Sequence, residues 1–528
     1  VHGKADRPVY LWVGEDSVEI RDAAFLAGKG AINCRETLKE RLGTAVRVVA
    51  IGPAGENQIP FATILADSDS SCSGGLGAVM GSKNLKAVAV RGKQKVNVAD
   101  LDGVRSLKGS ERPLVTEITS EVAPLNPIAP NKDKLKKEVC YGCTGCMRTR
   151  YQGESGRRGK FTCQSAFFYE VRAHRYYGTY NDIPFEATKL CDDYGLDSYF
   201  IDCLIMWLVR CTKAGVLTDD QTGIPLSKIG SLEFIETLIR KIAHRDGFGQ
   251  VLARGIYEAA EAVGIEGQKL IGDYVNKNAH IPLYGPRMYI TTGLFYAMEP
   301  RLPIQQLHEI STLGILWAYR ENGPRGKPFT PEVMRAIAKR FWGSEAAGDF
   351  STYEGKAQAA ARIQDRQYAK ESLILCDFAW PLTLSERSEN YVGDPTLESR
   401  LCAAVTGQDI DEAGLYQIGE RVLNLQRAIL AREGHAGRDY DVLEDFEYNT
   451  PLKGDVGNPD CSVPGKDGET FSRKGMVVDR AQFERIKDEY YEIRGWDVGT
   501  GLQKRETMEQ LGLGEVAETL AREDLLVS

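Results

Sequence analysis

The sequence of 528 residues contains no apolar run long enough to span a lipid bilayer. The nearest run, Tyr199 to Val209 (YFIDCLIMWLV), is short and includes Asp202, so it predicts a buried helix. No signal peptide is recognisable at the start. The opening residues, VHGKADRPVYLWV, are typical of the middle of a β-rich domain and carry no initiator methionine.

Cysteine is too sparse for a disulfide-stabilised fold, because twelve cysteines are spread unevenly over the chain. This pattern predicts a reduced, cytoplasmic protein that uses a few cysteines as metal ligands. The net charge is −8 with Lys and Arg dispersed, so no basic face for nucleic acid is visible. We therefore expect no nucleic-acid partner.

The length predicts two or three domains. Residues 1–97 show short apolar runs between glycines, which are typical of strands, and residues 112–137 contain four prolines and predict a linker. Later segments repeat apolar residues every three or four positions. We expect an α+β fold, with a β-rich domain (1–97) followed by two mainly α-helical domains (98–275 and 276–528). The expected helices include 185–191, 232–242, 331–341, 356–375, 412–432, 480–493 and 505–523, with a surface loop at 450–474.

Three cysteines, Cys140, Cys143 and Cys146, form a C-x2-C-x2-C cluster that predicts metal ligation. Zinc is one alternative, but it is usually held by two local ligand pairs, and no second CxxC or HxxxH pair follows. An iron–sulfur cluster accepts a fourth cysteine from far away in the sequence. The candidates for that ligand are Cys376, Cys163, Cys191 and Cys402.

Two kinds of motif suggest a bound organic group. The turn Ser73 to Gly81 contains Gly74, Gly75 and Gly77, whose backbone amides would approach a phosphate closely, or form only a tight turn. The stretches Asp192–Asp197 (DDYGLD) and Glu371–Cys376 (ESLILC) echo one another. Carboxylates at such positions can bind an N–C–NH2 edge through two hydrogen bonds, as carboxylates bind arginine.

Taken together, these motifs resemble those of the aldehyde ferredoxin oxidoreductases, tungsten enzymes with a bis-pterin cofactor. The resemblance runs along the whole chain. Besides the cysteine cluster and the two echoing stretches, it rests on Ile51–Asn57, Gly74–Lys83, Glu420–Arg427, Arg432–Gly434, Tyr490–Asp497 and Leu511–Leu513.

The resemblance implies a tungsten or molybdenum bis-pterin beside a [4Fe–4S] cluster, with Mg²⁺ as a further expected ion between the pterin phosphates. It selects Cys376 as the fourth cluster ligand, because the second pterin motif ends there. The expected cluster ligands are then Cys140, Cys143, Cys146 and Cys376. The expected cofactor-binding residues are Gly74, Gly75, Gly77, Asp192, Gly195, Leu196, Asp197, Glu371 and Leu375.

The family also implies catalytic residues near the metal. Glu170, with its neighbour Tyr169, matches a glutamate that follows the cysteine cluster and would accept a proton. A histidine is expected before the last cluster ligand, but Gln305 stands at that interval and His308 is the nearest histidine. His280 and His174 are alternatives to His308, and Arg172 or Arg175 would suit an acidic substrate.

The chain departs from the family pattern at several positions. The family spaces its first three cysteines C-x2-C-x3-C, so Cys163 remains an alternative to Cys146 as third ligand. The family also has Asp, Gly and Arg where this chain has Glu371, Ile374 and Ser73. About 100 residues of the family's N-terminal domain precede the point where this chain begins to match. We therefore expect a truncated pterin-base domain or half of a split site.

The expected function is oxidation of a small aldehyde to a carboxylic acid, with electrons passed singly to a ferredoxin or a ferredoxin-like subunit. A homodimer is an expected assembly. Two alternatives remain. One is a low-potential reductase of acyl substrates, like the catalytic subunit of class II benzoyl-CoA reductase. The other is a remnant without the pterin that binds only a cluster or a partner chain.

Overall fold

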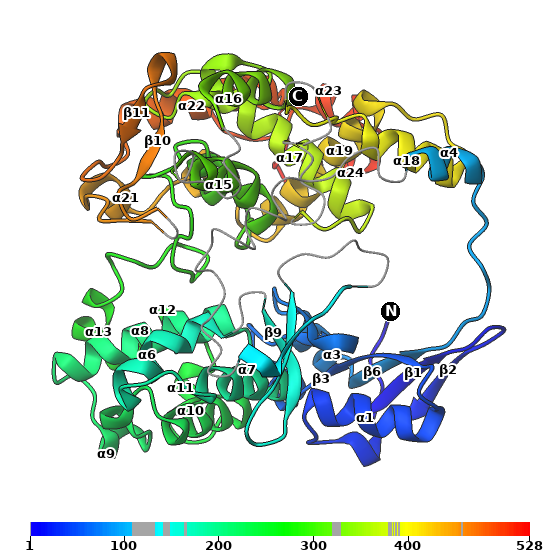
Figure 1. Ribbon diagram of the computed structural model, residues 1–528, viewed down its shortest axis with the longest axis vertical. Helices are drawn as coiled ribbons and strands as arrows, with labels where there is room; N and C mark the ends of the chain where they lie inside the picture. Colours follow the sequence, from blue (N-terminus) through cyan, green and yellow to red (C-terminus); the bar gives the residue numbers. More distant parts are fainter. Residues whose placement is uncertain are drawn as a thin grey trace.

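The computed structural model describes residues 2–107, 132–140, 148–162, 166–318, 329–377, 383, 385, 388, 391–455 and 458–527. The chain forms two lobes, one above the other in Figure 1. The lower lobe contains the elements from β1 to β6 and from β7 to α13. The upper lobe contains α4 and the elements from α14 to α24.

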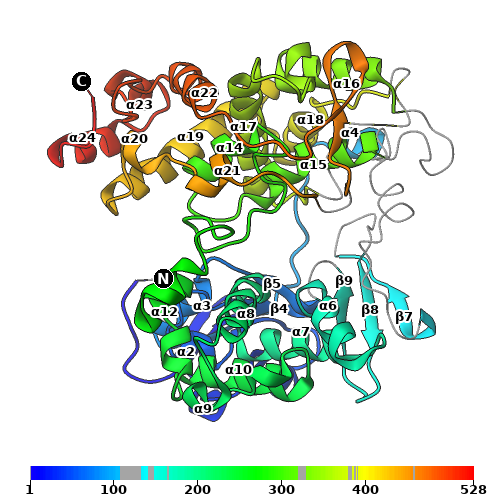
Figure 2. The same ribbon diagram turned by 90° about the vertical axis from the view of Figure 1, so that its left-hand side faces the viewer.

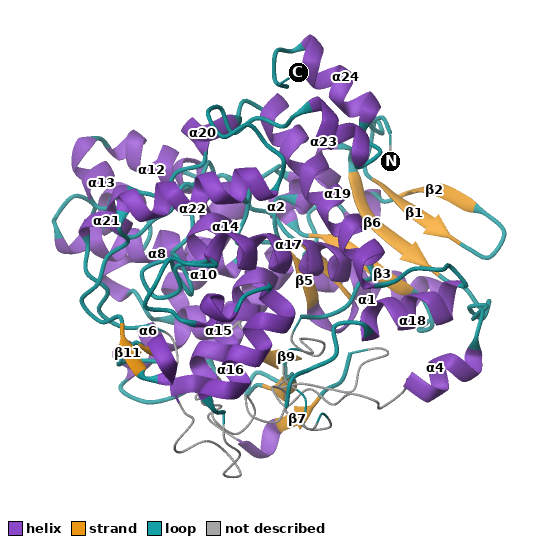
Figure 3. Ribbon diagram, turned by 90° about the horizontal axis from the view of Figure 1, so that it is seen from above, coloured by secondary structure: helices purple, strands orange, loops and turns teal. Residues whose placement is uncertain are grey.

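A six-stranded sheet forms one end of the lower lobe, in the order β2-β1-β6-β3-β4-β5. Among the described strands of this sheet, β1 and β6 pair in parallel and the other neighbours are antiparallel. Figure 3 shows β2 at the outer edge of this sheet. The strands are β1 (Val9–Val13), β2 (Val18–Asp22), β3 (Arg47–Ile51), β4 (Ile64–Ala66), β5 (Ser70–Cys72) and β6 (Leu85–Val90), and the accompanying helices are α1 (Ala31–Leu42), α2 (Pro53–Glu56) and α3 (Leu76–Ser82).

The rest of the lower lobe is a small sheet and a group of helices. The elements are β7 (Leu135–Lys137), β8 (Thr149–Gln152), β9 (Arg158–Thr162), α6 (Phe167–Tyr177), α7 (Ile183–Tyr194), α8 (Ser198–Lys213), α9 (Asp219–Thr222), α10 (Leu232–His244), α11 (Gly249–Leu252), α12 (Ile256–Val263) and α13 (Ile265–Lys269). Helix α8 confirms the buried helix predicted around Tyr199–Val209. Its Asp202 pairs with Arg172 at 2.6 Å, so Arg172 has an acidic partner inside the protein.

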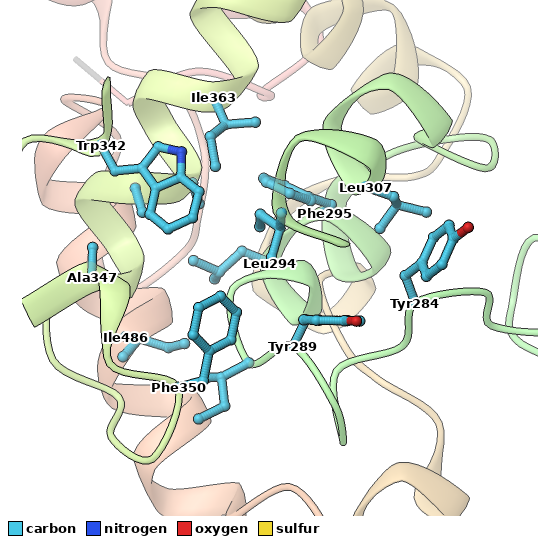
Figure 4. Packing of buried hydrophobic residues seen from close by; sticks show 14 of the residues in the cluster. Tyr284, Tyr289, Leu294, Phe295, Leu307, Trp342, Ala347, Phe350, Ile363 and Ile486 are labelled. Carbon is cyan, nitrogen blue, oxygen red and sulfur yellow. The ribbon is translucent and has the colours of Figure 1, made fainter. Parts of the chain in front are cut away.

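The upper lobe surrounds a large apolar cluster. Figure 4 shows Leu294, Phe295, Trp342 and Phe350 packed together in it. Its elements are α14 (Thr292–Met298), α15 (Ile304–Ala318), α16 (Pro331–Ile337), α17 (Lys356–Ser372), α18 (Leu397–Thr406), α19 (Glu412–Arg432), α20 (Gly437–Tyr440), α21 (Asp445–Asn449), β10 (Ser462–Pro464), β11 (Thr470–Ser472), α22 (Arg480–Ile493), α23 (Arg505–Gln510) and α24 (Gly514–Arg522). Helices α17 and α19 touch so closely that a Cβ at Gly419 would lie 1.8 Å from the Asp365 carbonyl oxygen.

The chain crosses between the lobes early. After β6 it runs upward to α4 (Leu101–Leu107), which lies beside α18 (Figure 1). The amide of Asp100 donates to the carbonyl of Ala404 at 2.8 Å. Helix α4 therefore packs on a segment assigned to the third domain, although the sequence placed it in the second. The domain boundaries 1–97, 98–275 and 276–528 stay predictions.

The α+β fold class is confirmed, and most expected helices lie where the periodicity placed them. The helix expected at 505–523 is two helices, because Gly512 adopts a left-handed conformation between α23 and α24 (φ 67°). The expected loop at 450–474 contains the short strands β10 and β11. The end of the expected linker forms β7. No helix in the described ranges is both long and apolar enough to cross a membrane.

Candidate functional site

The two echoing stretches of the sequence form the same backbone turn at the ends of two helices. After α7, Gly195 adopts a left-handed conformation (φ 76°), and after α17, Ile374 does the same (φ 58°). The leucine that follows donates its amide to the carbonyl five residues back, from Leu196 to Cys191 and from Leu375 to Lys370, at 2.9 Å each. Such left-handed turns satisfy the last carbonyls of a helix. The sequence echo is therefore a structural repeat across the two lobes.

Asp197 ends the first turn and begins the next helix. Its Oδ1 accepts a hydrogen bond from the amide of Tyr199 at 2.9 Å, as the N-cap of α8. Within the described ranges, only Oδ1 of Asp197 accepts hydrogen bonds, and Oδ2 accepts none. One carboxylate oxygen therefore remains for a ligand.

Asp192, at the start of the same motif, is engaged inside the protein. It is buried, and its Oδ2 lies 2.5 Å from Nζ of Lys189, which also binds Asp69 at 2.9 Å. Asp69 in turn pairs with Arg35 at 2.7 Å. Burial opposes ionisation of Asp69, but the two cations hold the pKa of its carboxyl far below the ordinary value. This series of buried ion pairs links α7 to the N-terminal sheet. The cofactor role of Asp192 stays a prediction.

The glycine-rich turn precedes α3 and reaches the same region as the two motifs. Gly74 and Gly75 are both left-handed (φ 78° and 77°). A Cβ at Gly77 would lie 2.5 Å from the carbonyl oxygen of Thr63, so glycine allows the close packing of α3 on the chain beside it. A Cβ at Gly74 would meet no heavy atom within 4 Å, so this side of the turn is open.

Charges from both lobes converge beside this turn. Burial raises the pKa of the Cys72 thiol, with Arg301 opposing the shift and Asp197 and Glu371 adding to it. Arg301 pairs with Glu371 at 3.2 Å. Asp197 of the first motif and Glu371 of the second are thus near one thiol. Cys72 and Arg301 were not predicted as site residues, because neither belongs to a recognisable ligand pattern in the sequence.

The described part of the cysteine cluster is exposed. Cys140 follows β7, and the amide of Glu138 donates to the carbonyl of Arg148 at 3.1 Å, which extends the pairing of β7 with β8. Cys376 is exposed just after the Ile374 turn. Cys143, Cys146 and Cys163 lie outside the described residues. Within the described ranges, no three His, Cys, Asp or Glu side chains are grouped to hold a metal ion, so the four-cysteine cluster stays a prediction.

The expected acid–base residues on α6 have different surroundings. Glu170 is half-buried and lines a small pocket with His174 and Tyr180. Tyr169 is fully buried, and its hydroxyl donates to the carbonyl of Ser231 at 2.7 Å. This bond anchors α6 to the start of α10. The catalytic roles of Glu170 and Tyr169 stay predictions.

His308, on α15, adjoins the second motif. Its Nδ1 lies 2.5 Å from Oδ2 of Asp377, the residue after Cys376. Burial opposes ionisation of Asp377, but His308 and Lys370 lower the pKa of its carboxyl. A carboxylate only accepts hydrogen bonds, so Nδ1 carries the proton and Nε2 is the basic nitrogen of the neutral ring. Asp377 was not predicted as a site residue, because its partner His308 lies 69 residues away in the sequence.

Aromatic rings surround the histidine candidates. Tyr284 packs edge-on against His308 with 6.0 Å between ring centroids, and Figure 4 shows its hydroxyl turned away from the apolar cluster. Tyr284 has a left-handed backbone (φ 52°), which is rare for an aromatic residue and is found at functional sites. The ring of His280 stacks on that of Tyr199, with 5.4 Å between centroids. Burial lowers the pKa of His280, and the charge of Asp197 opposes this shift. His174 lies on α6 against Tyr180.

Comparison with known proteins identifies the chain along almost its whole length. Residues 1–92 match the model for the N-terminal domain of aldehyde ferredoxin oxidoreductase, and residues 119–513 match the model for its domains 2 and 3. The tungsten-containing aldehyde ferredoxin oxidoreductase of Pyrococcus furiosus is 27% identical over 98% of this chain and 81% of its own length. The corresponding enzyme of Thermococcus kodakarensis is 26% identical with the same coverage.

Two further relatives carry other names. The aliphatic sulfonate oxidoreductase, WOR-like subunit, of Pyrococcus furiosus is 26% identical over 99% of this chain and 81% of its own length. The active site complex BamBC of benzoyl coenzyme A reductase has the same fold, with a TM-score of 0.70, 22% identity and coverage of 100% of this chain and 82% of that chain. The family models together span far more than half of the residues. The chain therefore belongs to the aldehyde ferredoxin oxidoreductase family.

Proposed function

We propose that the protein is a tungsten- or molybdenum-pterin oxidoreductase that oxidises an aldehyde to a carboxylic acid. The observation that carries the proposal is the repeated left-handed turn after α7 and α17, which holds Asp197 in one lobe and Glu371 in the other. Its support is membership of a family whose relatives are named tungsten-containing aldehyde ferredoxin oxidoreductases.

The described residues fit a bis-pterin group in two respects. The open side of the turn at Gly74 leaves room for a phosphate, and Oδ2 of Asp197 is available to an N–C–NH2 edge. Asp197, Gly195 and Leu196 would hold one pterin, and Glu371 and Leu375 the other. When bound, the metal group would polarise the aldehyde carbonyl and accept two electrons.

The protein would supply orientation and proton transfer. Oxidation of an aldehyde adds the oxygen of one water and releases two protons and two electrons. We assign His308 as the first proton acceptor, because Asp377 accepts its Nδ1–H, so that Nε2 is the unprotonated nitrogen of the neutral ring. Glu170 is the second candidate. The electrons would leave singly through a cluster held by Cys140, Cys143, Cys146 and Cys376 to a ferredoxin-type partner.

Metal analysis of natively purified protein tests the cofactor. Tungsten or molybdenum together with about four irons per chain is the expected composition. Iron without either heavier metal would contradict the proposal and favour the remnant that binds only a cluster. Aldehyde-dependent reduction of a viologen dye then tests the reaction, with an aliphatic sulfonate tested in parallel.

Reduction of an acyl thioester is the second candidate function. The specific observation that favours it is Gln305, which stands where the family's histidine is expected and whose buried Oε1 has no partner in the described ranges. An aromatic acyl-CoA that reoxidises the reduced protein, combined with no aldehyde oxidation, would select this function.

A further inference from the structure

The small sheet β7–β9 carries like charges in one row across its three strands. Lys136 pairs in register with Arg150, and Arg150 pairs with Lys160 on the other side. Directly opposite residues point to the same face, with about 5 Å between Cβ atoms, and like charges at such positions destabilise a sheet. Folding alone gives no reason for this row.

The opposite face of the same sheet is apolar and covered. Tyr151 and Phe161 point to that face and pack on Phe185 of α7, with 5.2 Å between the rings of Tyr151 and Phe185. The charged face is therefore turned outward. Lys136, Arg150 and Arg158 are exposed on it. Figure 2 shows β7, β8 and β9 at the outer edge of the lower lobe.

The positive charge of this region is only partly neutralised. Residues 132–160 contain nine Lys and Arg against three Asp and Glu, a net charge of +6 in a chain of net charge −8. Glu138 pairs with both Arg148 and Arg150, at 3.0 and 3.3 Å. In the described ranges, Lys136 and Arg158 on this face have no acidic partner. A negatively charged surface would therefore gain from contact with this face.

Cys140, the one described cysteine of the predicted C-x2-C-x2-C cluster, lies at the end of the same sheet. Strands β7 and β8 stay paired up to Glu138 and Arg148, and Cys140 is exposed two residues after Glu138. A partner bound to the charged row would lie beside Cys140. With strands spaced about 4.8 Å apart, the row is roughly 10 Å long, which suits a compact group of carboxylates on a small protein.

We propose that the outer face of β7–β9, through Lys136, Arg150 and Arg158, is the docking surface for a small acidic electron-transfer protein. The electron-transfer part of this inference rests on the proposed function. The charge part does not, because it follows from the strand register. Long-range attraction between the two surfaces would guide the encounter, so binding would weaken as salt rises.

A binding experiment without turnover tests the surface. The wild-type holoprotein and the variant Lys136→Gln/Arg150→Gln/Arg158→Gln are titrated with a bacterial [4Fe–4S] ferredoxin at about 20 mM and about 300 mM salt. The triple variant should bind ~10-fold more weakly at low salt, and wild-type binding should weaken at high salt. A matched control, Lys453→Gln/Lys466→Gln/Arg522→Gln, removes three exposed charges from the upper lobe and should bind like wild type.

Two results would overturn the inference. One is a ferredoxin affinity equal to that of wild type in the triple variant. Equal affinity in the single variants Arg150→Gln and Arg158→Gln, which perturb the fold less, would count in the same way. The other is binding of this face to a short duplex DNA or to anionic vesicles but not to ferredoxin. Viologen reduction by the triple variant should match wild type. If the wild-type protein binds ferredoxin but does not oxidise aldehydes, only the proposed function is refuted.

Discussion

His308 and Asp377 share a hydrogen bond of 2.5 Å that links α15 to the residue after Cys376. The two side chains come from segments 69 residues apart, and both are largely shielded from water. The pair fixes the orientation and the tautomer of the ring beside the second left-handed turn. It therefore connects a candidate base to the motif expected to hold both a pterin and a cluster ligand.

Loss of either partner of this pair should impair catalysis. We expect Asp377→Ala to lower kcat for aldehyde-dependent viologen reduction ~10- to 100-fold, because the ring loses its orienting acceptor. His308→Gln should lower kcat at least as much. Since the residues act as a unit, the double variant should be no slower than His308→Gln. Independent, multiplicative losses would show that the pair is not used in this way.

Ile374 should be a source of local strain. It is 92% exposed and adopts a left-handed backbone (φ 58°), which disfavours a β-branched residue. Ile374→Gly should therefore raise the free energy of unfolding by about 1 kcal/mol, seen as a higher thermal midpoint. Ser372→Gly, in the last turn of α17, should lower it by a similar amount. A lower midpoint for Ile374→Gly would show that its side chain makes stabilising contacts.

The glycine-rich turn should separate folding from cofactor binding. Gly77→Ala places a methyl group 2.5 Å from the Thr63 carbonyl oxygen, so we expect a loss of about 2 kcal/mol or more in stability. Gly74→Ala meets open space and should cost about 1 kcal/mol for its positive φ alone. Pterin content per folded chain should nevertheless fall in Gly74→Ala. Full pterin content in Gly74→Ala would show that this turn does not bind the cofactor.

Lys370 should make stability depend on pH. It is buried, and within the described ranges its Nζ has no hydrogen-bond partner; burial lowers its pKa to about 8. An unfolded lysine has a pKa of about 10.4, so between these values the unfolded chain binds more protons and stability rises with pH. Lys370→Met should be more stable than wild type at neutral pH, and its advantage should shrink towards pH ~10. Thermal midpoints across this range measure the difference, and a constant difference would contradict the shifted pKa.

Much of the architecture could be predicted from local sequence. Apolar spacing located helices such as α10 and α19, and the family motifs located both left-handed turns. The sequence could not show that Tyr169 is a buried anchor for Ser231, because its burial depends on how α6 packs against α10. It also could not place α4 on α18, since nothing local in 98–107 specifies a partner 300 residues away.

The sequence by itself determined the family, the α+β class and the candidate ligands, because those depend on residue types at short, fixed spacings. Only the tertiary structure decided which charges meet. Lys136, Arg150 and Lys160 lie 10 to 14 residues apart in the sequence, and only strand register aligns them in one row. Likewise, folding brings Glu371 to Arg301 and His308 to Asp377. Electrostatic interactions act through space, so long-range packing, and not order along the chain, sets them.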